Sequence, residues 1–106
     1  MTDKIVVFST ASSAEEAEKI ARVLVEERLA ACVNVLPGAR SVYRWKGAIE
    51  SSAEWVLIIK SSRERFDRLC TRLEKIHSYE VPEVVALAVV DGSSNYLNWL
   101  ETELSD

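Results

Sequence analysis

The chain has 106 residues, 48% of them hydrophobic and 28% charged, which is the composition of one small globular domain spanning residues 1–106. Its formal net charge is −4, and its lysines and arginines are dispersed, which argues against nucleic acid and an anionic membrane surface as partners. Because no apolar run approaches the ~20 residues of a transmembrane helix and no signal-peptide pattern precedes the first apolar run, we expect a cytoplasmic protein.

The first two predicted elements are a strand and a helix. Residues 4–10 form a short apolar run rich in β-branched side chains, which is typical of a buried strand. Ser13 and Glu16 follow at capping-box spacing, and apolar residues at helical intervals predict a helix over residues 14–28. Its apolar stripe is one-sided, so we expect this helix to pack against a sheet.

A long hairpin comes next. Two β-rich runs, Cys32–Trp45 and residues 49–60, flank a turn at residues 46–48. Pro37 and Gly38 interrupt the first run, and because proline cannot donate a ladder hydrogen bond we expect an edge strand or a bulge there. Residues 55–59 are apolar enough to predict burial on both faces.

The second helix is expected to follow directly. Ser61 and Ser62 are its predicted caps, and its apolar stripe runs from Phe66 to Ile76. His77 continues this stripe, and residues 78–83 form a loop because they contain a proline.

Residues 84–90 predict another buried strand, and Ser94 is the expected cap of a short amphipathic C-terminal helix. The order β-α-β-β-α-β plus a terminal helix predicts an α+β fold. It is the ferredoxin-like sandwich, a four-stranded antiparallel sheet with two helices on one face.

The hairpin is too long for the helices that should cover it. A helix of ~15 residues spans about 22 Å, whereas an arm of ~14 residues reaches roughly 45 Å. The overhang carries Val42, Tyr43, Trp45 and Ile49. An exposed aromatic patch and a free strand edge are features that soluble proteins avoid. We therefore predict that another subunit packs on these four residues.

His77, the only histidine, lies close to Tyr79 and two glutamates in residues 77–83. Imidazole and carboxylate can together bind a divalent cation, but a histidine at a helix C-terminus can also serve as a capping group. The spacing matches neither a zinc nor an EF-hand signature, so both readings stay open.

Glu54 and Lys60 are six residues apart and so point to the same face of the sheet. They are either solvated strand charges or part of a cleft with His77 and Tyr79. Cys32 and the second cysteine lie in no Cys-x-x-Cys motif, which favours reduced, buried thiols. No phosphate-binding glycine loop, activated nucleophile or acid–base pair is evident, so we expect no enzymatic activity.

Four stretches together resemble the CutA family of divalent-cation tolerance proteins. They are EERLAACVNVLPG (residues 26–38), SVYRWKG (41–47), HSYEVPE (77–83) and YLNWL (96–100). The resemblance covers essentially the whole chain. It implies a cytosolic homotrimer assembled through the long strands, similar to PII-type signalling proteins, and a role in tolerance of divalent metals, copper especially. It also implies a polar cluster in the clefts between subunits, at positions Cys32, Trp45, Glu54, Lys60, His77 and Tyr79.

Three departures from the family pattern bear on metal binding. Some members carry a cysteine where this chain has Ser9 and a second histidine where it has Ile76, and Ser78 replaces the usual proline. A copper site built from such ligands would keep only His77, so we expect weak binding of Cu(II) or another divalent cation and no obligatory cofactor. The alternative is a PII-like sensor without intrinsic metal binding, whose clefts hold an anionic metabolite through Lys60, His77 and Tyr79.

Overall fold

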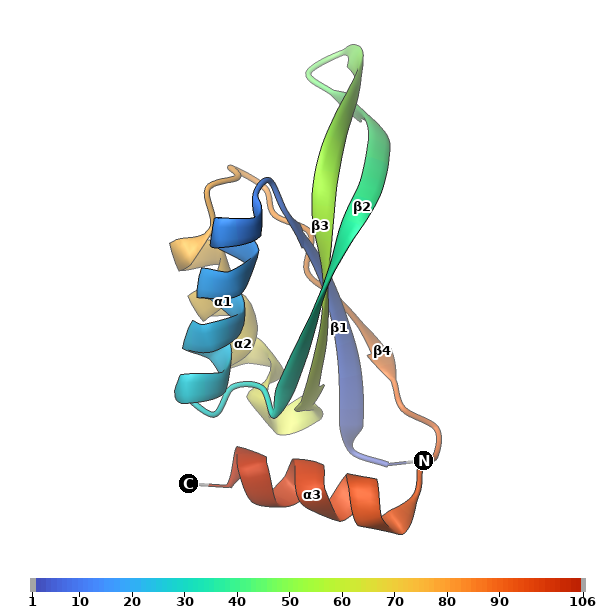
Figure 1. Cartoon of the computed structure of the whole chain (residues 1–106). Helices are drawn as coiled ribbons and strands as arrows, with labels where there is room; N and C mark the ends of the chain where they lie inside the picture. Colours follow the sequence, from blue (N-terminus) through green and yellow to red (C-terminus); the bar gives the residue numbers. More distant parts are fainter. Residues whose placement is uncertain (1, 106) are drawn as a thin grey trace.

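The computed structural model describes residues 2–105 and confirms the α+β class. All strand pairs are antiparallel, and the four strands lie in the order β2-β3-β1-β4. Helices α1 and α2 cover one face, and α3 crosses the end of the sheet opposite the hairpin tip (Figure 1). The elements are β1 (Lys4–Ala11), α1 (Ala14–Glu26), β2 (Cys32–Trp45), β3 (Ala48–Ser62), the 3-10 helix η1 (Arg63–Arg65), α2 (Phe66–Ile76), β4 (Val85–Ala88) and α3 (Ser94–Leu104).

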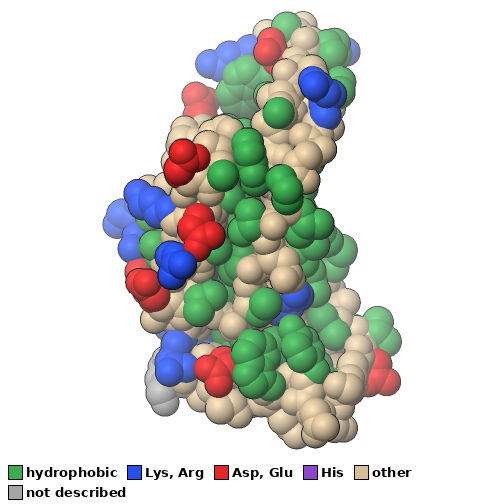
Figure 2. Space-filling view, in the orientation of Figure 1, with side chains coloured by type: hydrophobic (Ala, Val, Ile, Leu, Met, Phe, Trp, Pro, Cys, Tyr) green, Lys and Arg blue, Asp and Glu red, His purple; other side chains and the backbone are tan. Residues whose placement is uncertain are grey.

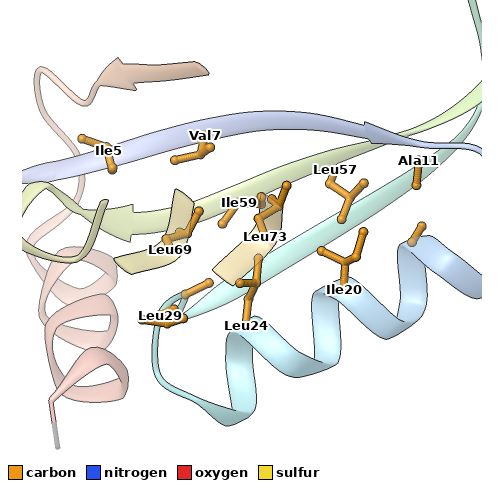
Figure 3. Packing of buried hydrophobic residues seen from close by; sticks show 12 residues of the cluster. Ile5, Val7, Ala11, Ile20, Leu24, Leu29, Leu57, Ile59, Leu69 and Leu73 are labelled. Carbon is orange, nitrogen blue, oxygen red and sulfur yellow. The ribbon is translucent and has the colours of Figure 1, made fainter. Parts of the chain in front are cut away.

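The core lies between the sheet and the two helices. Apolar side chains at alternate positions of β1 and β3 point toward one stripe of α1 and one of α2 (Figure 3). The residues labelled in this cluster are Ile5, Val7, Ala11, Ile20, Leu24, Leu29, Leu57, Ile59, Leu69 and Leu73. Among residues 2–105, no helix is long and apolar enough to cross a membrane.

The hairpin matches its prediction closely. Lys46 and Gly47 form a two-residue turn with φ of 49° and 85°, the left-handed pattern that suits the twist of paired strands. The register shifts between Leu36 and Ala39, which confirms the bulge at the proline–glycine pair, and Gly38 has φ 89° there. Strand β2 also lies at the edge of the sheet, where a proline is tolerated because one side of the strand has no partner to which its N–H would donate.

The predicted caps of the second helix are wrong. Ser61 and Ser62 are the last residues of β3, and η1 separates them from α2. The hydroxyl of Ser61 donates to the backbone oxygen of Leu29 at 2.6 Å, whereas Ser62 makes no capping hydrogen bond. Pairing with β1 extends the strand past the point where local capping chemistry predicted its end.

Other boundaries differ from expectation for identifiable reasons. Helix α1 ends at Glu26, because Arg28 has a left-handed φ of 57°. Strand β4 is shorter than predicted and exposed rather than buried, since it lies at a sheet edge and no element of the described chain covers the outer face. The cap of α3 is Ser93, whose hydroxyl accepts the N–H of Tyr96, rather than Ser94.

Among residues 2–105, no helical layer covers the other face of the sheet, where Val56 and Ile58 are only half-buried. Residues 55–59 are therefore fully buried only at Leu57 and Ile59, which point to the helices, and not on both faces as predicted. Figure 2 shows hydrophobic side chains along the sheet, with charged ones gathered on the helical side and near the hairpin tip.

Candidate functional site

The loop that joins α2 to β4 holds His77 in a buried position against the end of β1. His77 is the C-cap of α2 and has an extended backbone conformation. The prediction that it continues the apolar stripe of the helix is therefore wrong. Its side chain is 0% exposed. The Nε2–H donates to the backbone oxygen of Thr10 at 2.7 Å, and Nδ1 accepts the backbone N–H of Tyr79 at 3.0 Å. These partners fix the tautomer and occupy both ring nitrogens.

Glu16 fastens the same loop to the start of α1. Its backbone N–H is capped by the Ser13 hydroxyl at 3.1 Å, as predicted. Its carboxylate, however, accepts the N–H and hydroxyl of Ser12 and the backbone N–H of Ser78, at 3.2, 3.1 and 2.8 Å. Burial opposes the ionised form, but the hydrogen bonds from Ser78 and Ser12 outweigh it and lower the pKa of Glu16. One oxygen lies 3.7 Å from Nδ1 of His77.

Buried Glu54 and half-buried Tyr79 form a polar pair across the loop and β3. The phenol donates to Oε2 of Glu54 at 2.5 Å, and Glu54 is only 6% exposed. Burial and the Glu54 carboxylate both raise the pKa of Tyr79, since the phenolate would lie in a desolvated site next to a negative charge. The ring of Tyr79 also contacts His77, with 4.7 Å between ring centroids.

A groove of about 670 Å³ opens between this loop and the overhanging hairpin. Among residues 2–105, the side chains that line it carry carboxylates, hydroxyls, aromatic rings and the methyl groups of valines, and none of them is a lysine, arginine or histidine. The lining residues are Thr10, Ser41, Val42, Tyr43, Trp45, Glu54, Ser78, Tyr79, Glu80, Val81 and Glu83. We call this the hairpin groove. Its charge favours cations over anions.

Two of the residues expected in the cleft lie elsewhere in the chain. Lys60 pairs with Cys32 across β3 and β2, and its Nζ lies 4.0 Å from Sγ of Cys32 while donating to Oδ1 of Asn34. Lys60 shares the sheet face of Glu54 but lies six residues further along β3, roughly 20 Å at 3.3 Å per residue. Within one chain, therefore, Trp45, Glu54 and Tyr79 meet at the groove with His77 behind them, whereas Cys32 and Lys60 form a separate group.

The four predicted interface residues of the overhang are exposed in the single chain. Val42 and Ile49 are 67% and 63% exposed, and Tyr43 and Trp45 are 43% and 38% exposed. No helix of the described chain covers them.

The sequence reading missed several residues of the site. Glu16 was assigned only to helix capping, and Thr10 and Asn34 were not singled out. Glu16 could have been suspected, because the carboxylate of a capping box needs only one of its two oxygens for a backbone N–H near the cap, which leaves the other for a distant donor. Thr10 contributes a backbone oxygen, for which the sequence carries no signal. Among residues 2–105, no group of three or more His, Cys, Asp or Glu side chains is arranged to hold a metal ion.

Comparisons with known proteins agree on one family. The family model described as "CutA1 divalent ion tolerance protein" matches residues 5–103. A divalent-cation tolerance protein CutA of Thermus thermophilus is 47% identical over 90% of this chain and 92% of its own length. A chloroplastic CutA of Arabidopsis thaliana is 44% identical over 92% of this chain, which spans 53% of that protein. The crystal structure of CutA from Xylella fastidiosa superposes with a TM-score of 0.95 and 46% identity, covering 98% of this chain and 100% of the other.

Proposed function

The chain belongs to the CutA1 divalent ion tolerance protein family, and on that premise we propose that it acts in tolerance of divalent cations, copper included, as a cytoplasmic homotrimer. Like its family, it is a tolerance protein rather than an enzyme. The free thiols of Cys32 and Cys70 suit a reducing compartment.

The exposed overhang of the hairpin is the observation that carries the trimer. It combines aromatic and β-branched side chains with the free edge of β2, and both features are usually covered in soluble proteins. Packing against neighbouring copies would bury them. A cleft that joins the Cys32–Lys60 group to the hairpin groove requires two subunits, because the distance along β3 separates them within one chain.

We propose a weak divalent-cation site at the cleft between subunits, with His77 as its nitrogen ligand, although in the single chain this side chain is fully buried behind the hairpin groove. The Glu16 oxygen 3.7 Å from Nδ1 supplies a carboxylate beside it. Binding at Nδ1 requires that the N–H of Tyr79 be released, so a metal must replace an existing hydrogen bond. This exchange is the physical reason for weak affinity, together with Ser9 and Ile76 in place of softer ligands.

The occupied ring nitrogens favour a second candidate, a PII-like trimer that senses a small molecule without intrinsic metal binding. An anionic metabolite held by Lys60, His77 and Tyr79 would need the lysine of a neighbouring subunit. The carboxylates of the groove work against an anion on the Tyr79 side.

Light scattering at micromolar concentration tests the assembly. We expect a particle of three 11.9 kDa chains, and we expect Val42→Ser with Ile49→Ser to dissociate it. Val25→Ser is the matched control, because Val25 is also exposed, at 42%, but lies on α1. A monomeric wild type would overturn the proposed trimer.

Calorimetric titration with Cu(II) tests the metal. We expect saturable heat that falls in His77→Ala and in Cys32→Ser, while Cys70→Ser, which changes a thiol on α2, behaves as the wild type. If the wild type gives no more heat than an unrelated protein, direct binding is wrong. A thermal-shift screen with metabolites then tests the sensor, because a ligand that binds only the folded state raises the melting temperature.

A further inference from the structure

We propose that Cys32 and Lys60 are the site of a peroxide-driven modification, in which the thiol sulfur becomes bonded to the lysine nitrogen as a sulfenamide. The two residues are directly paired across β2 and β3, and Nζ of Lys60 lies 4.0 Å from Sγ of Cys32. Because both residues belong to one chain and to neighbouring strands of one sheet, this contact does not depend on how subunits assemble. The modification goes beyond the proposed function and needs neither a bound metal nor His77.

A hydrogen bond holds the lysine amine beside the sulfur. Lys60 donates to Oδ1 of Asn34, which lies two residues along β2 from Cys32 and therefore on the same face of the sheet. Among residues 2–105, no carboxylate forms an ion pair with this lysine. The amine can therefore leave the neutral amide without separating two charges, and its flexible stem allows Nζ to close the remaining distance to the sulfur.

The second cysteine of the chain lies in different surroundings. Cys32 and Cys70 are both free and half-buried. Burial raises the pKa of the Cys70 thiol, and the carboxylates of Glu74 and Asp67 raise it further, which disfavours the thiolate that reacts with oxidants. Cys32 has an ammonium group beside it instead, and partly exposed thiols in electropositive surroundings are those that peroxides oxidise. We therefore expect hydrogen peroxide to react with Cys32 before Cys70.

Hydrogen peroxide is the oxidant in a sequence of two balanced steps. The Cys32 thiolate attacks one peroxide oxygen, so the S–O bond forms as the O–O bond breaks, and the leaving hydroxide takes a proton to become water. The sulfur of the resulting sulfenic acid has given two electrons to the peroxide. The neutral amine of Lys60 then attacks this sulfur, the S–N bond forms, and the hydroxyl leaves with an amine proton as a second water. One peroxide thus converts one thiol and one amine into a sulfenamide and two waters.

The fold favours this product over a disulfide within the chain. Cys70 lies on α2, which packs on the face of the sheet to which Leu57 and Ile59 point. Cys32 and Lys60 point to the opposite face, so the sheet separates the two thiols. A sulfenic acid condenses with a nitrogen held next to it, and Lys60 supplies that nitrogen. Condensation would remove a thiol and a positive charge from the proposed cleft and would link the start of edge strand β2 to β3.

Peptide mapping of the assembled protein in EDTA, after brief exposure to hydrogen peroxide, tests the proposal. Unreacted thiols are blocked with iodoacetamide before digestion with trypsin. We expect a linked peptide pair that joins Cys32 to Lys60, is lighter by two hydrogens than its two peptides together, and separates again in dithiothreitol. Cys32 should be consumed at least about tenfold faster than Cys70. Sulfinic acid at Cys32, a disulfide between subunits, or unreacted Cys32 in place of the linked pair overturns the proposal.

Lys60→Arg separates the two steps. A guanidinium group keeps the positive charge beside the thiol, but it stays protonated and cannot attack the sulfur as a neutral amine. We expect this variant to accumulate the sulfenic acid, which dimedone traps on Cys32, and to form no linked pair. Cys70→Ser, the matched control, should form the linked pair in wild-type yield. Linkage of Cys32 to other amines in equal yield would show non-specific chemistry and overturn the proposal.

The modification and the metal site fail separately. Titration with Cu(II) uses the reduced protein, whereas peroxide is applied in EDTA. A linked pair without Cu(II) binding would refute only the metal site, and saturable Cu(II) binding without a linked pair would refute only the modification. If Lys60→Arg does not fold, the peptide map of the wild type still decides.

Discussion

Replacing Tyr79 by phenylalanine isolates the hydrogen bond that joins the loop to the hairpin. The substitution removes one hydroxyl and leaves the ring in place. That hydroxyl donates to the carboxylate of Glu54 at 2.5 Å, and Glu54 is only 6% exposed. A hydrogen bond to a charged group contributes about 1.5–3 kcal/mol to stability. We therefore expect Tyr79→Phe to lower the free energy of unfolding by about 2 kcal/mol.

A double-mutant cycle with Glu54→Gln separates the pair from other effects. Urea denaturation measures the free energy of unfolding of each variant, from which the coupling between the two residues is calculated. All variants are compared at one fixed protomer concentration, because assembly makes stability depend on concentration. We expect a coupling of about 1–2 kcal/mol, because the amide retains a weaker acceptor. The coupling should hold from pH 7 to 10, since burial and Glu54 raise the pKa of Tyr79 and keep its hydroxyl protonated. A coupling below about 0.5 kcal/mol would refute the assignment of this bond as a fixed part of the site.

Three further predictions test the surrounding framework. Ser61→Ala should destabilise the protein by about 1–3 kcal/mol in urea denaturation, because it leaves the buried backbone oxygen of Leu29 without its donor. Ser62→Ala, the control, should change stability little, because the Ser62 hydroxyl makes no capping hydrogen bond. Equal effects of the two substitutions would contradict the geometry. Glu16 has a lowered pKa, so it adds stability above the ordinary glutamate pKa that is lost as pH falls through the folded-state value. Glu16→Gln should remove this part of the acid dependence, and an unchanged pH profile of melting would show that the carboxylate contributes nothing. Gly47→Ala should lower the free energy of unfolding by about 1–2 kcal/mol through backbone conformation alone, since φ is 85° and an added Cβ meets no atom within 4 Å. An unchanged melting curve in circular dichroism would mean that the turn does not hold this conformation.

The hairpin shows how far local sequence rules reach. Its turn at Lys46 and Gly47 and its bulge at Pro37–Gly38 depend on backbone freedom of single residues, which neighbours in the sequence largely decide. The same rules failed at Ser61. A serine followed three residues later by glutamate usually indicates a helix cap. Here, however, Ser61 pairs with β1, which is far away in the sequence, and so remains part of strand β3.

The candidate site divides in the same way. Residue types and the family resemblance identified Trp45, Glu54, His77 and Tyr79, and the groove brings three of them together. They could not reveal that both nitrogens of His77 are occupied, because one partner is a backbone oxygen 67 residues away.

By itself, then, the sequence determined the order of strands and helices, the turn and bulge of the hairpin, and the excess length that leaves Val42 and Ile49 uncovered. These follow from periodicity, backbone preference and rise per residue, all of which are local. Only the tertiary structure decided that Glu16 holds the loop beside His77, that Tyr79 donates a hydrogen bond to Glu54, and that Lys60 lies apart from them. Such contacts depend on how helices dock on the sheet, and docking sets distances that no local pattern encodes.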